Sequence, residues 1–317
     1  MVSISAGIIF GTVALPIGAI GAALIGGGDA TTVTIVRDLR LPRVVAAALV
    51  GGALAVAGAM LQGLLRNPLA DPYVTGASAG GALGAVAVIA FAASAPSIVV
   101  PLAAFAGALA AVALVWRMAR LGGRTTILTV LLAGVVLTAF AGAIVTLVIV
   151  ASDRLSLHLR ALLDVLVGGI SVRDPAELVA AGLIIGAGLI GALALAPRVD
   201  AYAFGEETAA TLGVDTERTT AGILVVTALL TGAAVALAGL VSFVGLVVPH
   251  ALRGRFGARH RPLVLACFLG GAAALVAADL GSRILLAPAE LPVGVITGAI
   301  GGPFFLFLLV RSRRITP

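Results

Sequence analysis

Few side chains in this sequence could carry out chemistry, and they do not form a catalytic or metal-binding pattern. The three histidines, His158, His250 and His260, are far apart, and the one cysteine, Cys267, lies inside an apolar run. A metal site needs clustered His, Cys and carboxylate ligands, so no metal or other cofactor is expected to be bound by this chain. Because the chain has no lysine, it has no Walker A phosphate loop. If ATP drives the protein, a partner subunit hydrolyses it, and this chain is not an enzyme.

Arginine is the abundant ionisable residue, and one group of arginines precedes a long apolar run. Arg37, Arg40 and Arg43 come directly before a charge-free stretch over 44–65. Long basic side chains at a helix end commonly lie along the membrane interface. Contact with an external partner is the alternative interpretation of this group.

Two carboxylates lie at the ends of the last two apolar runs, where ionisable groups are candidates for function. They are Asp279 and Glu290. Arg283 follows Asp279 by one helical turn, so the sequence predicts an ion pair between these two residues. A proton-coupling role for Asp279 is the competing interpretation.

Two loops carry further polar patterns. Residues 66–72 read RNPLADP, which predicts a stiff turn because proline fixes φ and Asn or Asp caps helix ends. Residues 205–213 read GEETAATLG, which predicts a short helix with an acidic first turn that Gly213 ends. Its small apolar face could seat in a groove of another protein. A surface helix without a partner is the alternative.

The elements that position these residues are predicted to be membrane helices. Hydrophobic residues make up 61% of the chain and charged residues 11%, with a mean hydropathy of +1.21, whereas soluble domains carry about 25% charged residues. The apolar runs lie at 5–25, 44–65, 73–92, 98–116, 127–150, 176–196, 219–248, 262–278 and 291–310. We predict an all-α polytopic membrane protein of about ten transmembrane helices, forming one domain over 1–317.

Two of the segments need a separate interpretation. The run 219–248 would be about 45 Å long as one helix, which is too long for an untilted crossing, so a break at Gly239 or Gly245 is expected. Segment 155–171 alternates leucines with polar residues and is predicted to be an amphipathic helix at the surface. Close helix packing is expected where glycines recur at intervals of four. Such pairs are Gly80 and Gly84, Gly182 and Gly186, and Gly298 and Gly302.

The distribution of arginine orients the predicted helices. Thirteen of the twenty arginines fall in the alternate loops that follow a cytoplasmic N-terminus and in the C-terminal tail. Basic residues are enriched on the cytoplasmic side of membrane proteins. Both termini are therefore predicted to be cytoplasmic.

Three motifs along nearly the whole chain carry a resemblance to a known family. The first runs from RLPR at 40–43 through RNPLADP to GASAGGALG at 76–84. The second is FVGLVVPH at 243–250, and the third runs from ADL at 278–280 through APAELPVG to GPFF at 302–305. In this order they resemble the FecCD family, the permease subunits of type II ABC importers for iron-siderophores, haem and cobalamin.

The resemblance implies contacts with other proteins. Arg40, Arg43 and Arg283 match arginines that dock acidic residues of an external substrate-binding protein in the family. The loop at about 197–218 resembles the coupling loop by which such permeases engage their ATPase. The coupling residues would be Glu206, Ala209, Leu212 and Gly213. One departure is Arg259, which stands where the family commonly has an acidic residue before His-Arg.

The resemblance also implies how cargo passes. Asn67 and Leu69 would form a cytoplasmic gate, with 125–129 as the facing region. The run 127–150 is the best candidate to line the pathway. Its small and weakly polar residues recur on one helical face, and packing of that face on a neighbouring helix is the alternative. These residues are Thr138, Gly142 and Thr146.

The expected assembly is a homodimer with its pathway on the two-fold axis, carrying two copies of a cytoplasmic ABC ATPase. It would lie in the prokaryotic cytoplasmic membrane, with no nucleic-acid partner. An iron chelate is favoured as cargo only because it is the commonest one in the family. The alternative function is an ion-gradient-driven secondary transporter. That class needs a buried acidic relay near the bilayer centre, and the interior runs contain no such carboxylate.

Overall fold

The apolar runs form helices in the computed structural model, which describes residues 2–11, 13–92, 94–96, 98–120, 127–151, 159–170, 172, 174–257 and 259–313. All regular elements of this described part are helical. The first half contains α1 (Val2–Ile9), α2 (Ile17–Leu24), α3 (Ala30–Val33), the π-helical η1 (Thr34–Arg40), α4 (Leu41–Leu64), the 3-10 helix η2 (Pro72–Thr75), α5 (Ala77–Phe91), α6 (Val99–Arg120) and α7 (Ile127–Ala151). The second half contains α8 (Leu159–Val167), α9 (Pro175–Tyr202), α10 (Glu206–Thr211), α11 (Thr216–Ala238), α12 (Val244–Phe256), α13 (His260–Ile284) and α14 (Val293–Arg313).

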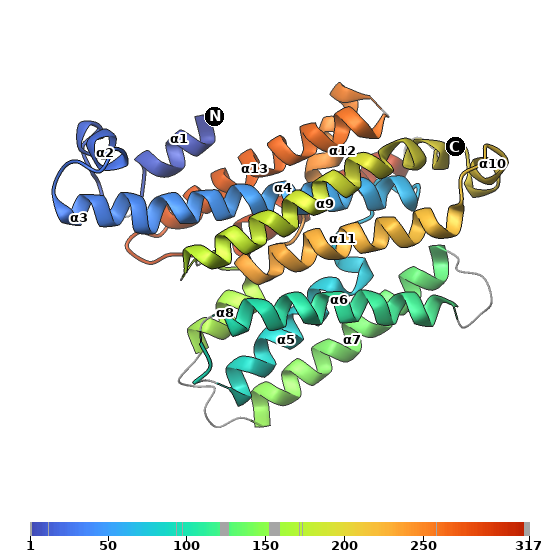
Figure 1. The fold of residues 1–317 in the computed structure, drawn as a ribbon, viewed down its shortest axis with the longest axis horizontal. Coiled ribbons are helices and arrows are strands. Elements are labelled where there is room, and N and C mark those ends of the chain that lie inside the picture. Colours follow the sequence, from blue (N-terminus) through green and yellow to red (C-terminus); the bar gives the residue numbers. More distant parts are fainter. Residues whose placement is uncertain are drawn as a thin grey trace.

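The long helices lie in two groups. In Figure 1, α4, α9, α11 and α13 run along the long axis of the molecule, and α5, α6 and α7 lie below them. Helix α11 joins the two groups because it packs against α4 and α9 on one side and against α5 and α6 on the other. Helices α2 and α3 lie at one end of the long axis, and α10 lies at the opposite end (Figure 1).

Among the described residues, six helices are long and apolar enough to cross a membrane. They are Ala30–Leu64, Val99–Arg120, Leu128–Ala151, Pro175–Tyr202, Thr216–Ala238 and His260–Ile284. Two shorter apolar helices, Ala77–Phe91 and Val293–Leu308, accompany them. The all-helical membrane architecture predicted from the sequence is confirmed. The number of ten crossings and the cytoplasmic position of both termini remain predictions.

The first apolar run, 5–25, is not the single helix that the sequence predicted. Helices α1 and α2 have eight residues each, or about 12 Å of helix, whereas a bilayer core is about 30 Å thick. Pro16 precedes α2, and the Arg40 side chain fills the space beside Gly11, where a Cβ would lie 2.9 Å from Nη2. The separation of α1 from α2 therefore depends on a side chain from η1.

The run 219–248 is divided, as the sequence predicted. Helix α11 ends just before Gly239, which has φ +61°, and α12 begins just after Phe243, which has φ +68°. The backbone N–H of Leu240, inside this break, donates to the carbonyl of Val165 at 2.9 Å. A Cβ on Gly239 would lie 2.5 Å from that same carbonyl oxygen. The break is thus fitted closely against the C-terminal part of α8.

Helix α8 is the described part of the segment predicted to be amphipathic. It has nine residues, too few to cross a bilayer, and it packs against α5, α11 and α14. Leu162 is buried, while Leu163 is 45% exposed. Residues 152–158, including His158, lie outside the described residues.

Glycines allow α4 to approach its neighbours at backbone distance. A Cβ on Gly51 would lie 2.2 Å from the carbonyl oxygen of Gly271 on α13, and a Cβ on Gly271 would lie 2.2 Å from that of Gly51. A Cβ on Gly58 would lie 1.8 Å from the carbonyl oxygen of Gly245 on α12. Such close approach is how membrane helices gain packing energy without a hydrophobic effect.

Of the three glycine pairs that were predicted to pack closely from their spacing of four residues, one does so within the described chain. Gly80 and Gly84 do pack closely, since a Cβ on either would fall within 2.5 Å of an α6 carbonyl oxygen. The prediction was wrong for the other two pairs, which have no atom of the described chain closer than 3.8 Å to an added Cβ. Those residues are Gly182, Gly186, Gly298 and Gly302.

Candidate functional site

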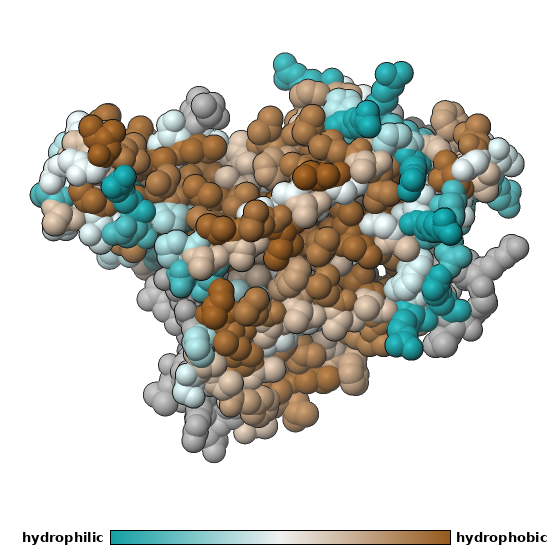
Figure 2. All heavy atoms as spheres, viewed as in Figure 1, coloured by the Kyte–Doolittle hydropathy of each residue, from teal (hydrophilic) through white to brown (hydrophobic). Residues whose placement is uncertain are grey.

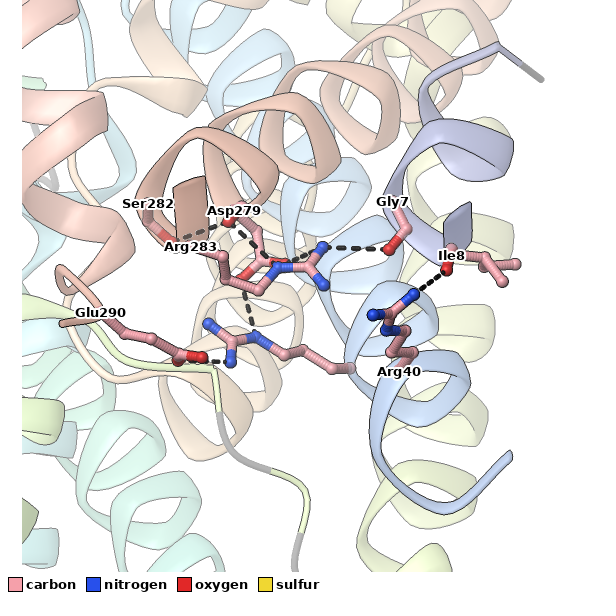
Figure 3. Close-up of polar contacts among 8 residues, drawn as sticks. Gly7, Ile8, Arg40, Asp279, Ser282, Arg283 and Glu290 are labelled. Carbon is pink, nitrogen blue, oxygen red and sulfur yellow. Dashed lines mark hydrogen bonds and ion pairs between the residues drawn. The ribbon is translucent and has the colours of Figure 1, made fainter. Parts of the chain in front are cut away.

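Four charged residues form an ion-pair cluster beside η1, here called the outer cluster: Arg43, Asp279, Arg283 and Glu290 (Figure 3). Arg43 donates through Nε to Asp279 Oδ1 at 2.9 Å and through Nη1 to Glu290 Oε2 at 2.8 Å. Arg283 Nη2 lies 3.1 Å from Asp279 Oδ2, which confirms the ion pair predicted from the sequence. The Asp279 side chain is fully buried. The cluster therefore joins α4 and α13 through one carboxylate.

Arg40 faces the N-terminal segment and does not join this cluster. Its guanidinium donates to the carbonyl oxygens of Ile8 at 2.9 Å and Ile9 at 3.0 Å, and also to that of Val13. Carbonyls at the end of a helix lack partners within it, and a cation there satisfies them. Arg40 therefore fixes α1 to the start of α4 (Figure 3).

The outer arginines differ in how far a partner could reach them. Arg40 and Arg283 are 5% and 3% exposed, whereas the Arg43 side chain keeps 22% of its surface exposed. A cavity of about 280 Å³ opens here, and its lining includes Asp38, Arg40, Arg43, Arg283 and Glu290. Of the three arginines expected to dock a partner, Arg43 is the most accessible.

The turn after α4 has the stiffness that its prolines predicted. Arg66 adopts a left-handed φ of +48°. The Asn67 side-chain oxygen accepts the N–H of Leu69 at 2.9 Å. Asn67 is exposed and Leu69 is half-buried. Both expected gate residues therefore lie in one rigid turn. Of the facing region 125–129, residues 125 and 126 lie outside the described residues.

The next polar residue of this loop is a carboxylate that caps η2. Asp71 Oδ1 accepts the N–H of Tyr73 at 2.9 Å. Burial raises the pKa of Asp71 to about 6, although the hydrogen bond from Tyr73 opposes this shift. Gln62, near the end of α4, links this loop to α12, because its Nε2 lies 3.4 Å from the carbonyl oxygens of both Ala70 and Gly245.

The short helix predicted within 205–213 is present as α10. Glu206 and Glu207 occupy its first turn. Its end is closed by two backbone hydrogen bonds, from Gly213 to Ala210 at 3.0 Å and from Val214 to Ala209 at 3.0 Å. Gly213 has φ +83°. These bonds and this left-handed glycine form a Schellman motif.

In and beside α10, some side chains are buried against the rest of the chain and others are exposed. Ala209 is fully buried within this chain, so its packing holds the helix in place. Glu206 is half-buried. Leu212 is 64% exposed, and Phe204, which precedes the helix, is 73% exposed. The pattern of 205–213 indicated Leu212 but missed Phe204, which lies just outside it.

Helix α7 presents the candidate pathway residues on an open face. Thr138, Gly142 and Thr146 are all exposed. The Thr146 hydroxyl donates to the carbonyl of Gly142 at 2.9 Å, and no atom of the described chain lies within 4 Å of a Cβ added at Gly142. Within the described residues, this face does not pack on a neighbouring helix of the same chain.

One polar contact at the α10 end was missed from the sequence. His260 at the start of α13 meets Asp200 near the end of α9, with Nδ1 and Oδ1 2.6 Å apart. The two residues are 60 positions apart, and neither belongs to a pattern that would predict the pair. Only the folded chain brings them together.

Long apolar helices, an ion-pair cluster at one end and a short exposed helix at the other define a polytopic membrane protein. The model of the FecCD transport family matches residues 1–311, and the chain belongs to this family. It is therefore the permease subunit of an ABC importer.

Relatives and solved structures agree with this assignment. The chain is 43% identical over 292 residues to the cobalamin import system permease BtuC of Halobacterium salinarum, covering 91% of this chain and 76% of that protein. It is 40% identical over 281 residues to the hemin transport system permease HmuU of Yersinia pestis, covering 87% and 83%. A solved inward-facing structure of a metal-chelate type ABC transporter matches with a TM-score of 0.85 and 26% identity, covering 98% and 96%.

Proposed function

We propose that this permease works as a homodimer with two copies of a cytoplasmic ATPase. It imports a metal chelate, haem or cobalamin, delivered by an external binding protein, across a prokaryotic cytoplasmic membrane. The observation that carries the proposal is the family match over residues 1–311. Relatives named for cobalamin and hemin transport set the class of cargo.

The ATPase would contact α10 through the exposed side chains around it. Leu212 and Phe204 are large apolar groups with exposed fractions of 64% and 73%, and an amphipathic helix binds a partner by laying such groups in an apolar groove. The Schellman motif and the buried Ala209 fix α10 in place, and Phe204 and Leu212 flank its two ends. Motion of the ATPase would then be transmitted to the permease.

The binding protein would dock at the outer cluster through Arg43. The side chain is partly exposed and already holds a carboxylate, Glu290, whose side chain is 32% exposed. An acidic residue of the binding protein could take the place of Glu290 without leaving Asp279 unpaired. Such surface pairs govern orientation and rate of encounter more than affinity.

The pathway would lie between the α7 helices of two copies. The exposed face with Thr138, Gly142 and Thr146 is open in one chain, and a two-fold partner would supply the opposite wall. A proton-coupled mechanism through Asp279 is less well supported, since this carboxylate is held by Arg43 and Arg283 together.

Affinity purification from the native host tests the ATPase contact. The chain is extracted in mild detergent as wild type, as Leu212→Asp and as Leu285→Asp, and the proteins that come with it are identified by mass spectrometry. Leu285 is a matched control because it is also 64% exposed and lies at the end of α13 near the outer cluster. We expect a soluble ATPase with wild type and with Leu285→Asp, and its loss from Leu212→Asp. Absence of an ATPase from all three would contradict the proposed assembly.

A further inference from the structure

The last turn of α9 is attached to two other helices just before the chain enters the coupling segment 203–215. Asp200 Oδ1 accepts the backbone N–H of His260 at 2.8 Å and lies 2.6 Å from the His260 Nδ1. Tyr202 donates its hydroxyl to the carbonyl of Thr216 on α11 at 2.9 Å. One carboxylate therefore links the end of α9 to the first residue of α13.

Helix α4 covers the His260 side of this contact, whereas the Asp200 side chain is 35% exposed. The His260 side chain is 4% exposed. Gly63, in the last turn of α4, leaves the space that His260 and Val199 occupy, because a Cβ there would lie 2.4 Å from His260 Nε2 and 2.3 Å from Val199 Cγ1. Three helices meet at this point, and the rigid turn 66–72 follows directly.

Helix α13 connects this point to the outer cluster. Along its length it packs against α4 at backbone distance through Gly51 and Gly271. At its other end it carries Asp279 and Arg283 of the outer cluster. A displacement of its first turn would thus reach the outer cluster through one continuous helix.

We propose that Asp200 and His260 form a joint that fixes the coupling segment 203–215 to α13. When a partner displaces α10, the displacement is then transmitted to α13. Without this contact, bending within residues 203–215 would take up the displacement. Asp200 is a positioning residue in this scheme, since it acts through His260 and not on cargo. The proposal rests on the proposed function only in taking α10 as the contact for an ATPase.

Hydrogen–deuterium exchange of the purified permease in detergent tests the joint without any partner. Asp200→Ala removes both contacts, while Asp200→Asn keeps an oxygen that can accept from the His260 N–H. Asp174→Ala is the matched control, because Asp174 Oδ1 also accepts one backbone N–H, that of Ala176 at 2.8 Å, at the opposite end of α9.

We expect Asp200→Ala to speed amide exchange about fivefold in residues 206–214. Losing one hydrogen bond lowers the free energy of local opening by about 1 kcal/mol, which corresponds to this factor. Exchange there should stay near the wild-type rate in Asp200→Asn and Asp174→Ala. Faster exchange confined to the first turn of α13 would overturn the proposal, because the coupling segment would then be independent of the joint.

Transport by the permease reconstituted in proteoliposomes with its ATPase and the external binding protein provides the second readout. The probe is whichever of labelled cyanocobalamin, hemin or ferrichrome the wild type takes up. Asp200→Ala should keep ATP hydrolysis while the amount of probe moved per ATP falls about fivefold, with recovery in Asp200→Asn. If Asp200→Ala lost ATP hydrolysis and transport to the same extent, the proposed role of the Asp200–His260 joint in coupling them would be contradicted. Failure of the wild type to hydrolyse ATP or transport would contradict the proposed function, and the exchange experiment would still decide the joint.

Discussion

At the scale of single residues, Asp279 holds the outer cluster together, because this one buried carboxylate pairs with two arginines. Its side chain has no exposed surface, and that of Arg283 is 4% exposed. Removing one partner of a buried pair leaves the other charge uncompensated, which is more costly than the pair itself is worth. Glu290 lies at the exposed edge of the same cluster.

We therefore predict unequal effects of two neutral substitutions. Asp279→Asn should lower the free energy of unfolding by about 3–5 kcal/mol, whereas Glu290→Gln should lower it by less than about 1 kcal/mol. Thermal unfolding in detergent, followed by the fluorescence of Trp116, measures both. Equal losses of stability would show that the cluster does not centre on Asp279.

The ionisation of Asp71 predicts how the stability of the fold depends on pH. The pKa of this carboxyl is raised to about 6 in the fold, above the usual value of about 3.9 for an unfolded chain. The folded state thus binds the proton more tightly than the unfolded state. The resulting stabilisation is complete below about pH 4 and is lost as the pH rises through about 6.

Asp71→Asn keeps the oxygen that caps η2 but does not titrate. Above pH 6 the variant should be more stable than wild type by up to about 3 kcal/mol, and the difference should shrink towards pH 4. Melting temperatures of both proteins at a series of pH values provide the measurement. A difference that does not change with pH would refute the link to Asp71.

At the scale of elements, the approach of α4 to α12 depends on the absence of a side chain at Gly58. A Cβ would lie 1.8 Å from the carbonyl oxygen of Gly245, so Gly58→Ala should force the helices apart and cost about 1–3 kcal/mol, as overpacking does. Gly186→Ala on α9 is the control, since no atom of the described chain lies within 4 Å of the added Cβ. It should be neutral or slightly stabilising by helix propensity. Similar effects on the melting temperature would contradict the packing argument.

The elements also show what sequence reasoning could and could not predict. The ends of α10 and the break at Gly239 follow from local signals, an acidic first turn and glycines with positive φ, and both were predicted. The separation of α1 from α2 has one local signal, Pro16 before α2, which the sequence prediction overlooked. The hydrogen bonds from Arg40 that hold α1 could not be predicted, because Arg40 lies 27 to 32 residues from the carbonyls it binds. The Asp200–His260 contact has no local signal at all.

At the scale of the whole molecule, polar side chains concentrate at the two ends of the long axis. Figure 2 shows a brown apolar surface between them and hydrophilic side chains at the end that holds α10. Exposed arginines on the elements of this end include Arg120, Arg198, Arg218, Arg255, Arg259 and Arg261. Arginine at this end supports its assignment as the cytoplasmic side. The outer cluster would then lie on the opposite side, where we propose that the external binding protein docks.

The most direct test of the central claim is uptake by proteoliposomes that contain the permease, its ATPase and the external binding protein. Labelled cyanocobalamin, hemin and ferrichrome are offered separately, with ATP or with a proton gradient as the driving force. We expect ATP-dependent uptake of at least one of them by the wild type, and its loss in Leu212→Asp. Uptake that follows the proton gradient without ATP, or that is unaffected by Leu212→Asp, would contradict an ATPase-driven importer coupled through α10.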